Sequence, residues 1–262
     1  MTLLEARALR VDFAGRRVLG PVDVDLPAGQ VIGLVGPNGA GKSSLLKALA
    51  GLIDSASESC VMLGQALASM DHGARARAIG YLPQNPAVAW RLTVRELVEL
   101  GRLPHGDGAL HTGRTAVEAA LAALGLTAHA GRDVRTLSGG EAMRAHLARL
   151  AAGGHRVLLV DEPTASLDPG YQLEVLDYLR GLAATGHAAL LVLHDLPLAA
   201  RYCDRLIVLD AGRIVREGLP GSALDDELLA RVFKVRGIRA HIDGIDALVG
   251  ISSLSAHPEP TP

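Results

Sequence analysis

Short runs of apolar residues recur along the chain, and longer segments with apolar residues at helical spacing separate them. The runs cover residues 31–35, 157–160 and 189–193, and the helical segments include 141–152 and 171–184. A continuous apolar run of this length is typical of a strand buried on both faces of a parallel sheet, and a helix between two such strands serves as the crossover. The pattern therefore predicts an α/β fold with a mainly parallel sheet.

Other parts of the chain have different patterns. In the first 30 residues, branched apolar and polar positions alternate, which predicts an antiparallel β subdomain with turns at residues 14–15 and 27–29. Residues 92–152 are largely helical in pattern, so we expect an α-helical subdomain inserted at about residues 85–152.

We expect the main domain to end near residue 235. Residues 207–215 predict a β-hairpin centred on residues 210–212, followed by a short acidic helix. We assign residues 1–235 to one domain and residues 236–262 to a C-terminal extension. The last six residues alternate proline with polar residues and are expected to be a disordered tail.

Composition narrows the class of protein. With 49% hydrophobic residues in 262, the chain can bury a substantial core. It contains neither a continuous apolar run of about 18 residues nor a charged leader followed by an apolar core, so we expect neither a membrane span nor a secretory signal. A net charge of −2 without a basic cluster argues against nucleic acid as a partner. We expect Cys60 and Cys203 to be reduced thiols, and the scattered histidines at 105, 111, 129, 155 and 187 to be surface residues.

The most specific motif follows the apolar run 31–35 and opens a helix-forming segment that stops at Gly51. It matches the pattern G-x-x-x-x-G-K-[ST], in which glycines let backbone N–H groups point at phosphate oxygens and a helix N-terminus adds its dipole. Lys42 is expected to reach the β- and γ-phosphates, Ser43 to bind Mg²⁺, and Ser44 to contact the α-phosphate. The predicted phosphate-binding residues are Gly36, Pro37, Asn38, Gly39, Ala40, Gly41, Lys42, Ser43 and Ser44. Several classes of enzyme use this loop, so it does not identify the reaction.

A second glycine-containing segment, residues 137–141, precedes a helix that we expect to begin near Ala142. The spacing of Ser138 and Glu141 is that of a capping box, which by itself explains the segment. Gly139 and Gly140 weaken a first helical turn unless a ligand approaches the backbone closely, so a second anion-binding helix end is the functional alternative.

Polar residues follow the predicted buried strands. Asp161 and Glu162 come at the carboxyl end of one strand, where open α/β sheets bind ligands. An acidic pair here can merely cap the next turn. Because the phosphate loop is present, we instead expect Asp161 to hold Mg²⁺, directly or through water, and Glu162 to act as the general base for an attacking water.

Two further residues are candidates because of their positions. His194 directly follows the run 189–193 and would share the sheet edge with Lys42 and Glu162, where it can orient the γ-phosphate or the attacking water. Gln84 ends another predicted strand and can complete the Mg²⁺ and water shell. Taken singly, His194 is a rim residue and Gln84 a loop residue.

The order of these motifs along the chain resembles that of the ATP-binding cassette (ABC) ATPases. In the terms of that family they are the Walker A segment 36–43, the Q-loop residue Gln84, the signature 137–141, the Walker B segment 157–162, the D-loop 166–168 and the switch residue His194. The resemblance covers roughly residues 1–235. One departure is Ala142, where many members have a long polar residue.

The resemblance implies a P-loop NTPase core and a head-to-tail dimer. ATP would lie between the Walker A segment of one subunit and the signature of the other, contacted by Ser138, Gly139, Gly140 and Glu141, with Asp168 bridging the subunits. Phe13 matches the family's aromatic residue that stacks on adenine, although a role as a strand-end core residue is the alternative. The resemblance also implies ATP hydrolysis with Mg²⁺, because Glu162 and His194 are both present.

Flanking sequence at residues 90–105 and 194–204 resembles the importer branch for iron-siderophore, haem and cobalamin uptake. That branch implies a peripheral subunit on the cytoplasmic face of the cell (inner) membrane. It would dock on two transmembrane permease subunits through residues 85–102, with a substrate-binding protein as an indirect partner. An exporter subunit, and a soluble ABC ATPase that acts on nucleic acid or ribosomes, are the alternatives.

Overall fold

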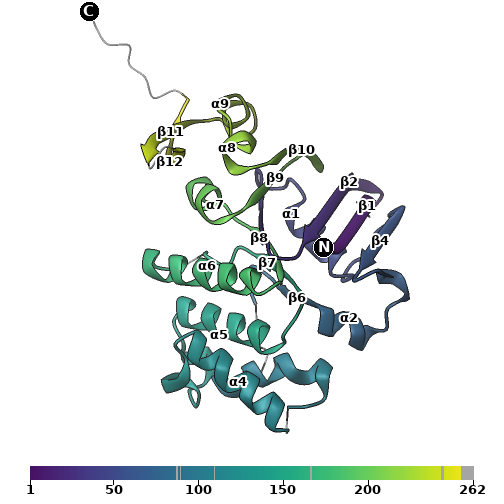
Figure 1. The fold of residues 1–262 in the computed structure, drawn as a ribbon, viewed down its shortest axis with the longest axis vertical. Coiled ribbons are helices and arrows are strands. Elements are labelled where there is room, and N and C mark those ends of the chain that lie inside the picture. The colour runs from purple at the N-terminus through teal and green to yellow at the C-terminus, as the bar shows by residue number, and fades with distance from the viewer. Residues whose placement is uncertain (87, 89, 109, 166, 243–244, 255–262) are drawn as a thin grey trace, which may run out of the picture.

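A six-stranded sheet forms the centre of the computed structural model, which describes residues 1–254 except 87, 89, 109, 166, 243 and 244. The strand order is β10-β9-β3-β8-β7-β6 (Figure 1). Five of these strands are parallel neighbours, and β10 pairs antiparallel with β9. The mainly parallel sheet is as predicted. Its strands are β3 (Val31–Val35), β6 (Ile79–Leu82), β7 (Val157–Asp161), β8 (Ala188–Val192), β9 (Arg205–Asp210) and β10 (Arg213–Gly218).

An antiparallel sheet of order β2-β1-β4-β5 stands beside the central sheet. Its two long strands are joined at Ala14 and Gly15, both with positive φ, where the sequence predicted a turn. The antiparallel N-terminal strands are therefore confirmed. The strands are β1 (Thr2–Phe13), β2 (Arg16–Pro27), β4 (Ser59–Met62) and β5 (Gln65–Ala66).

Helical structure fills the chain between β6 and β7, as the sequence predicted for residues 92–152. Its α-helices are α3 (Val94–Glu99), α4 (His111–Ala123) and α5 (Gly139–Ala152), with short 3₁₀ turns at Leu100–His105, Thr127–His129 and Val134–Thr136. Helix α5 begins three residues before Ala142, because Ser138 and Glu141 form a reciprocal capping box around the first turn.

The remaining helices lie around both sheets. They are α1 (Lys42–Leu49), α2 (His72–Ala78), α6 (Pro169–Ala184), α7 (Leu196–Tyr202), α8 (Pro220–Ala223) and α9 (Asp226–Leu228), with a 3₁₀ turn at Leu67–Ser69 and a π-helical turn at Leu229–Phe233. Among the described residues, no helix combines the length and apolar character needed to cross a bilayer.

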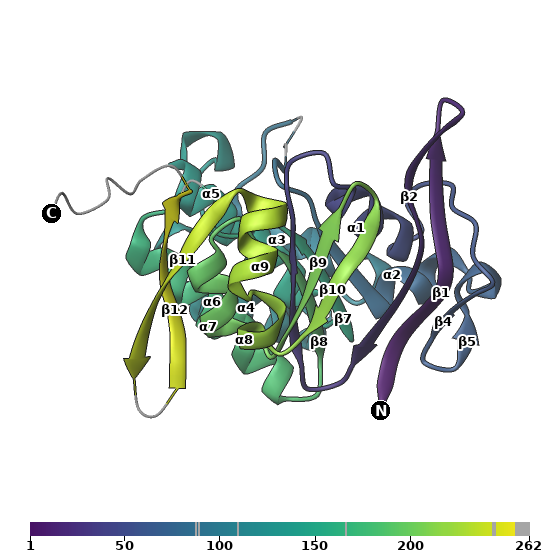
Figure 2. The same cartoon turned by 90° about the horizontal axis from the view of Figure 1, so that it is seen from above.

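The inner strands β3, β7 and β8 are buried on both faces, and successive residues belong to different cores. In β3, Val31 and Val35 pack with residues of α3 to α7, whereas Ile32 and Leu34 pack with α1 and the antiparallel sheet. Side chains alternate across a strand, so one short apolar run supplies both cores. Figures 1 and 2 show α1 and the antiparallel sheet on one side of the central sheet, and α5 and α6 on the other. This layering leaves the carboxyl ends of β3, β6, β7 and β8 at a common edge.

The C-terminal region forms a β-hairpin that the sequence did not predict. Strands β11 (Val235–Ile242) and β12 (Ile245–Ser253) pair antiparallel, and β12 packs against α7. Leu248 of β12 is buried there. The predicted disordered tail at 257–262 lies outside the described residues.

One histidine prediction was wrong. His155 is only 8% exposed, packed against Gly80 and Gly153. Burial lowers the pKa of His155 to about 4, so the imidazole is neutral at physiological pH. His146 on α5 is 2% exposed, and burial likewise lowers its pKa to about 4.

Candidate functional site

The phosphate-binding loop joins β3 to α1 at the carboxyl edge of the central sheet. Two of its glycines have steric reasons to be glycine. A Cβ on Gly36 would stand 2.0 Å from the carbonyl oxygen of Leu209, and Gly41 has φ +101° at the N-cap of α1. Between them the backbone turns tightly, so its N–H groups and the end of α1 form a ready anion site.

Lys42 is held inside this loop. Its side chain is 7% exposed, and Nζ donates hydrogen bonds to the carbonyl oxygens of Gly36, at 2.7 Å, and Pro37, at 2.9 Å. Burial lowers the pKa of Lys42, while the charges of Glu162 and Asp161 oppose that change. Because the ammonium is buried beside the anion site, an anionic ligand bound there would stabilise its positive charge more than it would stabilise that of an exposed lysine.

Glu162 stands at the centre of a hydrogen-bonded trio. Nε2 of Gln84 donates to one carboxylate oxygen at 2.6 Å, and Nε2 of His194 lies 2.5 Å from the other. Glu162 also has φ +55°, a left-handed conformation that is uncommon outside glycine. Strain of this kind at a polar residue concentrates at functional sites. The structure therefore brings together three residues that follow the ends of three different strands. In sequence, Gln84 is 78 positions and His194 is 32 positions from Glu162.

Asp161, the last residue of β7, directly precedes Glu162 and has an unsatisfied oxygen. The residue is 3% exposed, and its Oδ1 has no hydrogen-bond partner among the described residues. Burial raises the pKa of Asp161, and hydrogen bonding with the Ser43 side chain opposes that rise. A buried carboxylate oxygen beside a hydroxyl is a donor set that suits a hard divalent cation.

Any such cation would have few protein ligands. The described residues contain no group of three or more His, Cys, Asp or Glu side chains that could hold a metal ion. A Mg²⁺ ion usually takes one or two protein ligands and fills its shell with waters and substrate phosphates, a number that Ser43 and Asp161 can supply.

Two adjoining cavities flank the loop. One, of about 650 Å³, is lined by Val18, Asn38, Gly39, Ala40, Gly41, Lys42, Ser43, Ser44, Gln84, Glu162 and His194. The other, of about 730 Å³, shares Val18 and Ser44 with it and includes Phe13. Phe13 is 75% exposed, so its alternative role as a core residue is wrong.

Sequence patterns did not predict several buried or cavity-lining residues near the site. Val18, Lys47, Leu52, Ile53 and Asp54 line the cavity beside Phe13. The hydroxyl of Tyr81 is buried without a hydrogen-bond partner among the described residues, and burial together with the charge of Asp161 raises its pKa to about 12. These are common residue types without a motif, so no sequence pattern could have found them.

Comparison with known proteins decides the family. A profile described as ABC transporter matches residues 19–165, which include the loop, Gln84, Glu162 and the capping box of α5. The chain belongs to the ABC transporter family. Its P-loop NTPase fold, with a mainly parallel sheet, agrees with the fold predicted from the sequence.

Relatives of this ABC chain include proteins named for import. The hemin import ATP-binding protein HmuV of Myxococcus xanthus is 44% identical over 243 residues, covering 89% of this chain and 90% of the relative. HmuV of Pseudomonas putida is 40% identical and covers 98% of this chain and 96% of the relative. The cobalamin import ATP-binding protein BtuD of Halobacterium salinarum is 41% identical over 89% of this chain, but the match spans only 59% of that relative's length.

Solved structures agree on the fold. The ATP-binding subunit of an ABC transporter superposes with a TM-score of 0.76 at 27% identity, over 83% of this chain and 90% of that one. A structure described as an inward-facing ABC transporter of the metal-chelate type has a TM-score of 0.80 at 22% identity. That match covers 98% of this chain and 99% of the other.

The family's signature segment lies outside both cavities of this ABC chain. The side chain of Ser138 accepts from the N–H of Glu141, and Oε2 of Glu141 accepts from the N–H of Ser138 at 2.9 Å. The other oxygen of Glu141 pairs with Arg132 at 3.2 Å. The capping box is therefore present, whereas binding of an anion by Gly139 and Gly140 stays a prediction.

The D-loop is described in part. Ser166 lies outside the described residues, and Asp168 occupies the N-cap position of α6 without a side-chain capping bond. Neither the D-loop nor the signature lines the cavity that contains Lys42.

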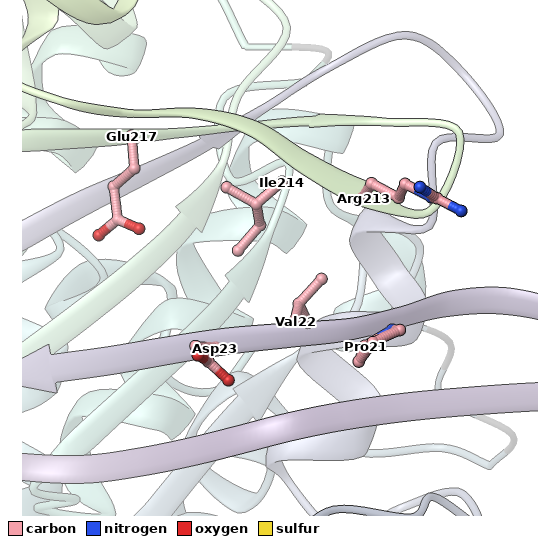
Figure 3. A pocket seen from close by; sticks show the side chains of 6 residues that line it. All are labelled: Pro21, Val22, Asp23, Arg213, Ile214 and Glu217. Atoms are coloured by element: carbon pink, nitrogen blue, oxygen red, sulfur yellow. The ribbon is translucent and has the colours of Figure 1, made fainter.

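A separate open groove of about 580 Å³ runs between β2 and β10 (Figure 3). Its walls are the edge strands of the two sheets, and Asp23, Arg213 and Glu217 are its charged residues. None of the predicted site residues lines it.

Proposed function

We propose that this chain is the ATP-hydrolysing subunit of an ABC importer that takes up a metal chelate of the haem, cobalamin or iron-siderophore type. The observation that carries the ATPase part is the position of Glu162. Its carboxylate is held by Gln84 and His194 in the cavity that also contains Lys42. Phosphate loop, base and orienting groups thus share one space.

Binding of ATP follows from the loop. The backbone N–H groups of the loop 36–44, other than Pro37, donate to oxygens of the phosphate chain. The ammonium of Lys42 leaves the carbonyl oxygens of Gly36 and Pro37 to contact phosphate oxygens. The triphosphate occupies the cavity with Lys42, and the adenosine occupies the adjoining cavity, where the open ring of Phe13 offers a stacking surface.

Hydrolysis then depends on a water placed beside Glu162. The carboxylate accepts a proton from the water as the water oxygen attacks the γ-phosphorus, while the bond from that phosphorus to the β–γ bridging oxygen breaks and ADP leaves. His194 and Gln84 fix the carboxylate, and with it the water, in line with the breaking bond. Ser43 and Asp161 would hold Mg²⁺, with Gln84 completing its shell, and the ion would neutralise charge on the phosphate oxygens.

The site needs a second subunit. In the family arrangement, the signature residues Ser138, Gly139 and Gly140 reach the γ-phosphate bound by a partner copy, and Asp168 lies between the two. In this chain the signature is outside the cavity with Lys42, which is the arrangement expected if it serves the partner's nucleotide. We therefore propose a head-to-tail dimer.

The import role rests on the relatives. Proteins named for hemin and cobalamin import match this chain at 40–44% identity. We propose that the dimer docks on two transmembrane permease subunits at the cytoplasmic face of the membrane, and that a substrate-binding protein delivers the chelate. Trp90, in the proposed docking segment 85–102, is 62% exposed; residues 87 and 89 of that segment lie outside the described residues.

A pull-down tests the assignment. The tagged chain is recovered from detergent-solubilised membranes of its native cell, and the proteins that come with it are identified by mass spectrometry. A polytopic permease with a substrate-binding protein is the expected result. A permease encoded without a binding protein would favour an exporter subunit, and ribosomes or nucleic acid in place of a permease would favour a soluble ABC ATPase.

Two variants test whether the permease docks through Trp90. Trp90→Ala should reduce permease recovery, because it removes the exposed indole of the docking segment. Leu219→Ala is the control, since Leu219 is 71% exposed on a different part of the chain. Equal recovery with both variants would contradict docking through Trp90.

A further inference from the structure

Arg144 on α5 is a buried cation whose main contact is an aromatic ring on another helix. It is 9% exposed, and its guanidinium carbon lies 4.3 Å from the centre of the Tyr171 ring on α6. Nη1 donates to the carbonyl oxygen of Leu124 at 3.2 Å, while Nε has no hydrogen-bond partner among the described residues. Burying a guanidinium with an unsatisfied N–H is costly, and the face of the ring supplies the compensating attraction.

A second contact joins the same two regions. A Cβ on Gly140 would lie 3.3 Å from the side chain of Leu167. Gly140 and Arg144 are one turn apart and so share a face of α5. This face of the signature helix therefore lies against the D-loop at Leu167 and against α6 at Tyr171.

The D-loop is in turn tied to α6. Nε2 of Gln172 donates to the carbonyl oxygens of Leu167, at 3.1 Å, and Thr164, at 3.4 Å. The backbone N–H of Gln172 also donates to the carbonyl oxygen of Asp168 at 3.0 Å. A contact that fixes the first turns of α6 therefore also fixes the segment between Glu162 and α6.

We propose that Arg144 and Tyr171 are a positioning pair that fixes the signature helix to the D-loop through the start of α6. The proposal rests on the proposed ATP-driven dimer, in which both segments must reach the partner subunit's nucleotide in one geometry. The two segments are far apart in sequence, so a contact between α5 and α6 sets their relative position. Neither residue lines the two cavities at the phosphate loop, so the effect of the pair is on closure of the dimer and on turnover.

Substitutions at Tyr171 distinguish the contribution of the aromatic ring from that of side-chain volume. Tyr171→Phe and Tyr171→Trp keep a ring face for Arg144 and should keep kcat within about twofold. Tyr171→Leu keeps an apolar side chain but removes the ring, and should lower kcat by about 3- to 30-fold, the range expected from loss of a cation–π contact. The KM for ATP should stay within about twofold, because the phosphate loop is unchanged.

A matched control lies on the same helix. Tyr178 of α6 packs against the core and makes no described contact with Arg144, so Tyr178→Leu should leave kcat unchanged. Equal kcat in Tyr171→Leu and Tyr171→Phe, or a change in KM alone, would overturn the positioning role.

Dimer formation distinguishes failure of this proposal from failure of the proposed function. ATP-dependent dimerisation is measured by gel filtration in Glu162→Gln alone and together with Tyr171→Leu or Tyr171→Phe. We expect dimer in Glu162→Gln and in the Phe double variant, and at least a tenfold higher ATP requirement in the Leu double variant. Absence of dimer in Glu162→Gln alone would count against the proposed dimer itself, whereas equal dimerisation in all three variants would overturn only the positioning pair.

Discussion

Nε2 of His194 lies 2.5 Å from Oε1 of Glu162, although the two residues follow different strands of the central sheet. The strands β7 and β8 are parallel neighbours, so the residues that follow them meet at one edge. With Gln84 on the other carboxylate oxygen, Glu162 is held from both sides. A carboxylate fixed in orientation in this way suits a general base that must accept a proton from a water at one position.

Glu162→Gln should nearly abolish ATP hydrolysis. An amide cannot accept the proton from the attacking water, so we expect kcat to fall by about 100- to 10,000-fold. ATP affinity should be unchanged, because the phosphate loop is intact. Steady-state phosphate release and equilibrium ATP binding measure the two effects, with Glu217→Gln in the remote groove as control. Rapid turnover by Glu162→Gln would refute the role of base.

Lys42→Ala should weaken nucleotide binding itself. The ammonium that contacts the β- and γ-phosphates is lost, and a charge-assisted hydrogen bond of 1.5–3 kcal/mol corresponds to about 10- to 150-fold in Kd. Titration with a fluorescent ATP analogue measures the change. Arg231→Ala removes an exposed positive charge from the π-helical turn at Leu229–Phe233 and should have no effect. An unchanged Kd in Lys42→Ala would contradict the phosphate-cradle assignment.

Phe13→Ala should raise the Kd for ATP by about 5- to 150-fold. A base stacked on an aromatic side chain gains about 1–3 kcal/mol, and alanine offers no ring face. Phe13→Tyr keeps the ring and should stay within about twofold of the parent chain. The same titration compares the two variants, and matching affinities would show that adenine does not stack on Phe13.

Acid should destabilise the fold through two buried histidines. Burial lowers the pKa of His146 and of His155 to about 4 from 6.5. Between these values the unfolded chain binds more protons than the folded one, so stability falls as pH decreases through 6.5 toward 4. From pH 7.5 to 5.5 the loss is about 1 kcal/mol for each histidine.

Urea titration at the two pH values checks this. His146→Leu should remove about half of the histidine-dependent loss in the free energy of unfolding, whatever its effect at pH 7.5. His111→Gln, at an exposed position, should leave the pH dependence unchanged. A pH dependence in His146→Leu equal to that of the parent chain would show that His146 is not the group responsible.

The sequence by itself determined the elements around the phosphate loop. The run 31–35 is continuously apolar, a helix-forming segment follows the glycines, and Gly51 has the positive φ of a residue just beyond a helix end. Buried parallel strands at 157–160 and 189–193 were predictable for the same reason, since an uninterrupted apolar run of four or five residues is typical of a strand buried on both faces. The capping box of α5 was predictable because its hydrogen bonds join residues three positions apart.

Tertiary structure alone decided the relationships between distant residues. The hydrogen bonds of Gln84 and His194 to Glu162, the burial of Lys42 and His155, and the contact of Arg144 with Tyr171 depend on which strands become neighbours and how α5 packs on α6. The β11–β12 hairpin likewise forms where β12 meets α7, and its residues have no strong alternation of their own. Local patterns record the preferences of neighbouring residues, whereas packing energy comes from side chains far apart in sequence, and only the assembled fold brings those side chains into contact.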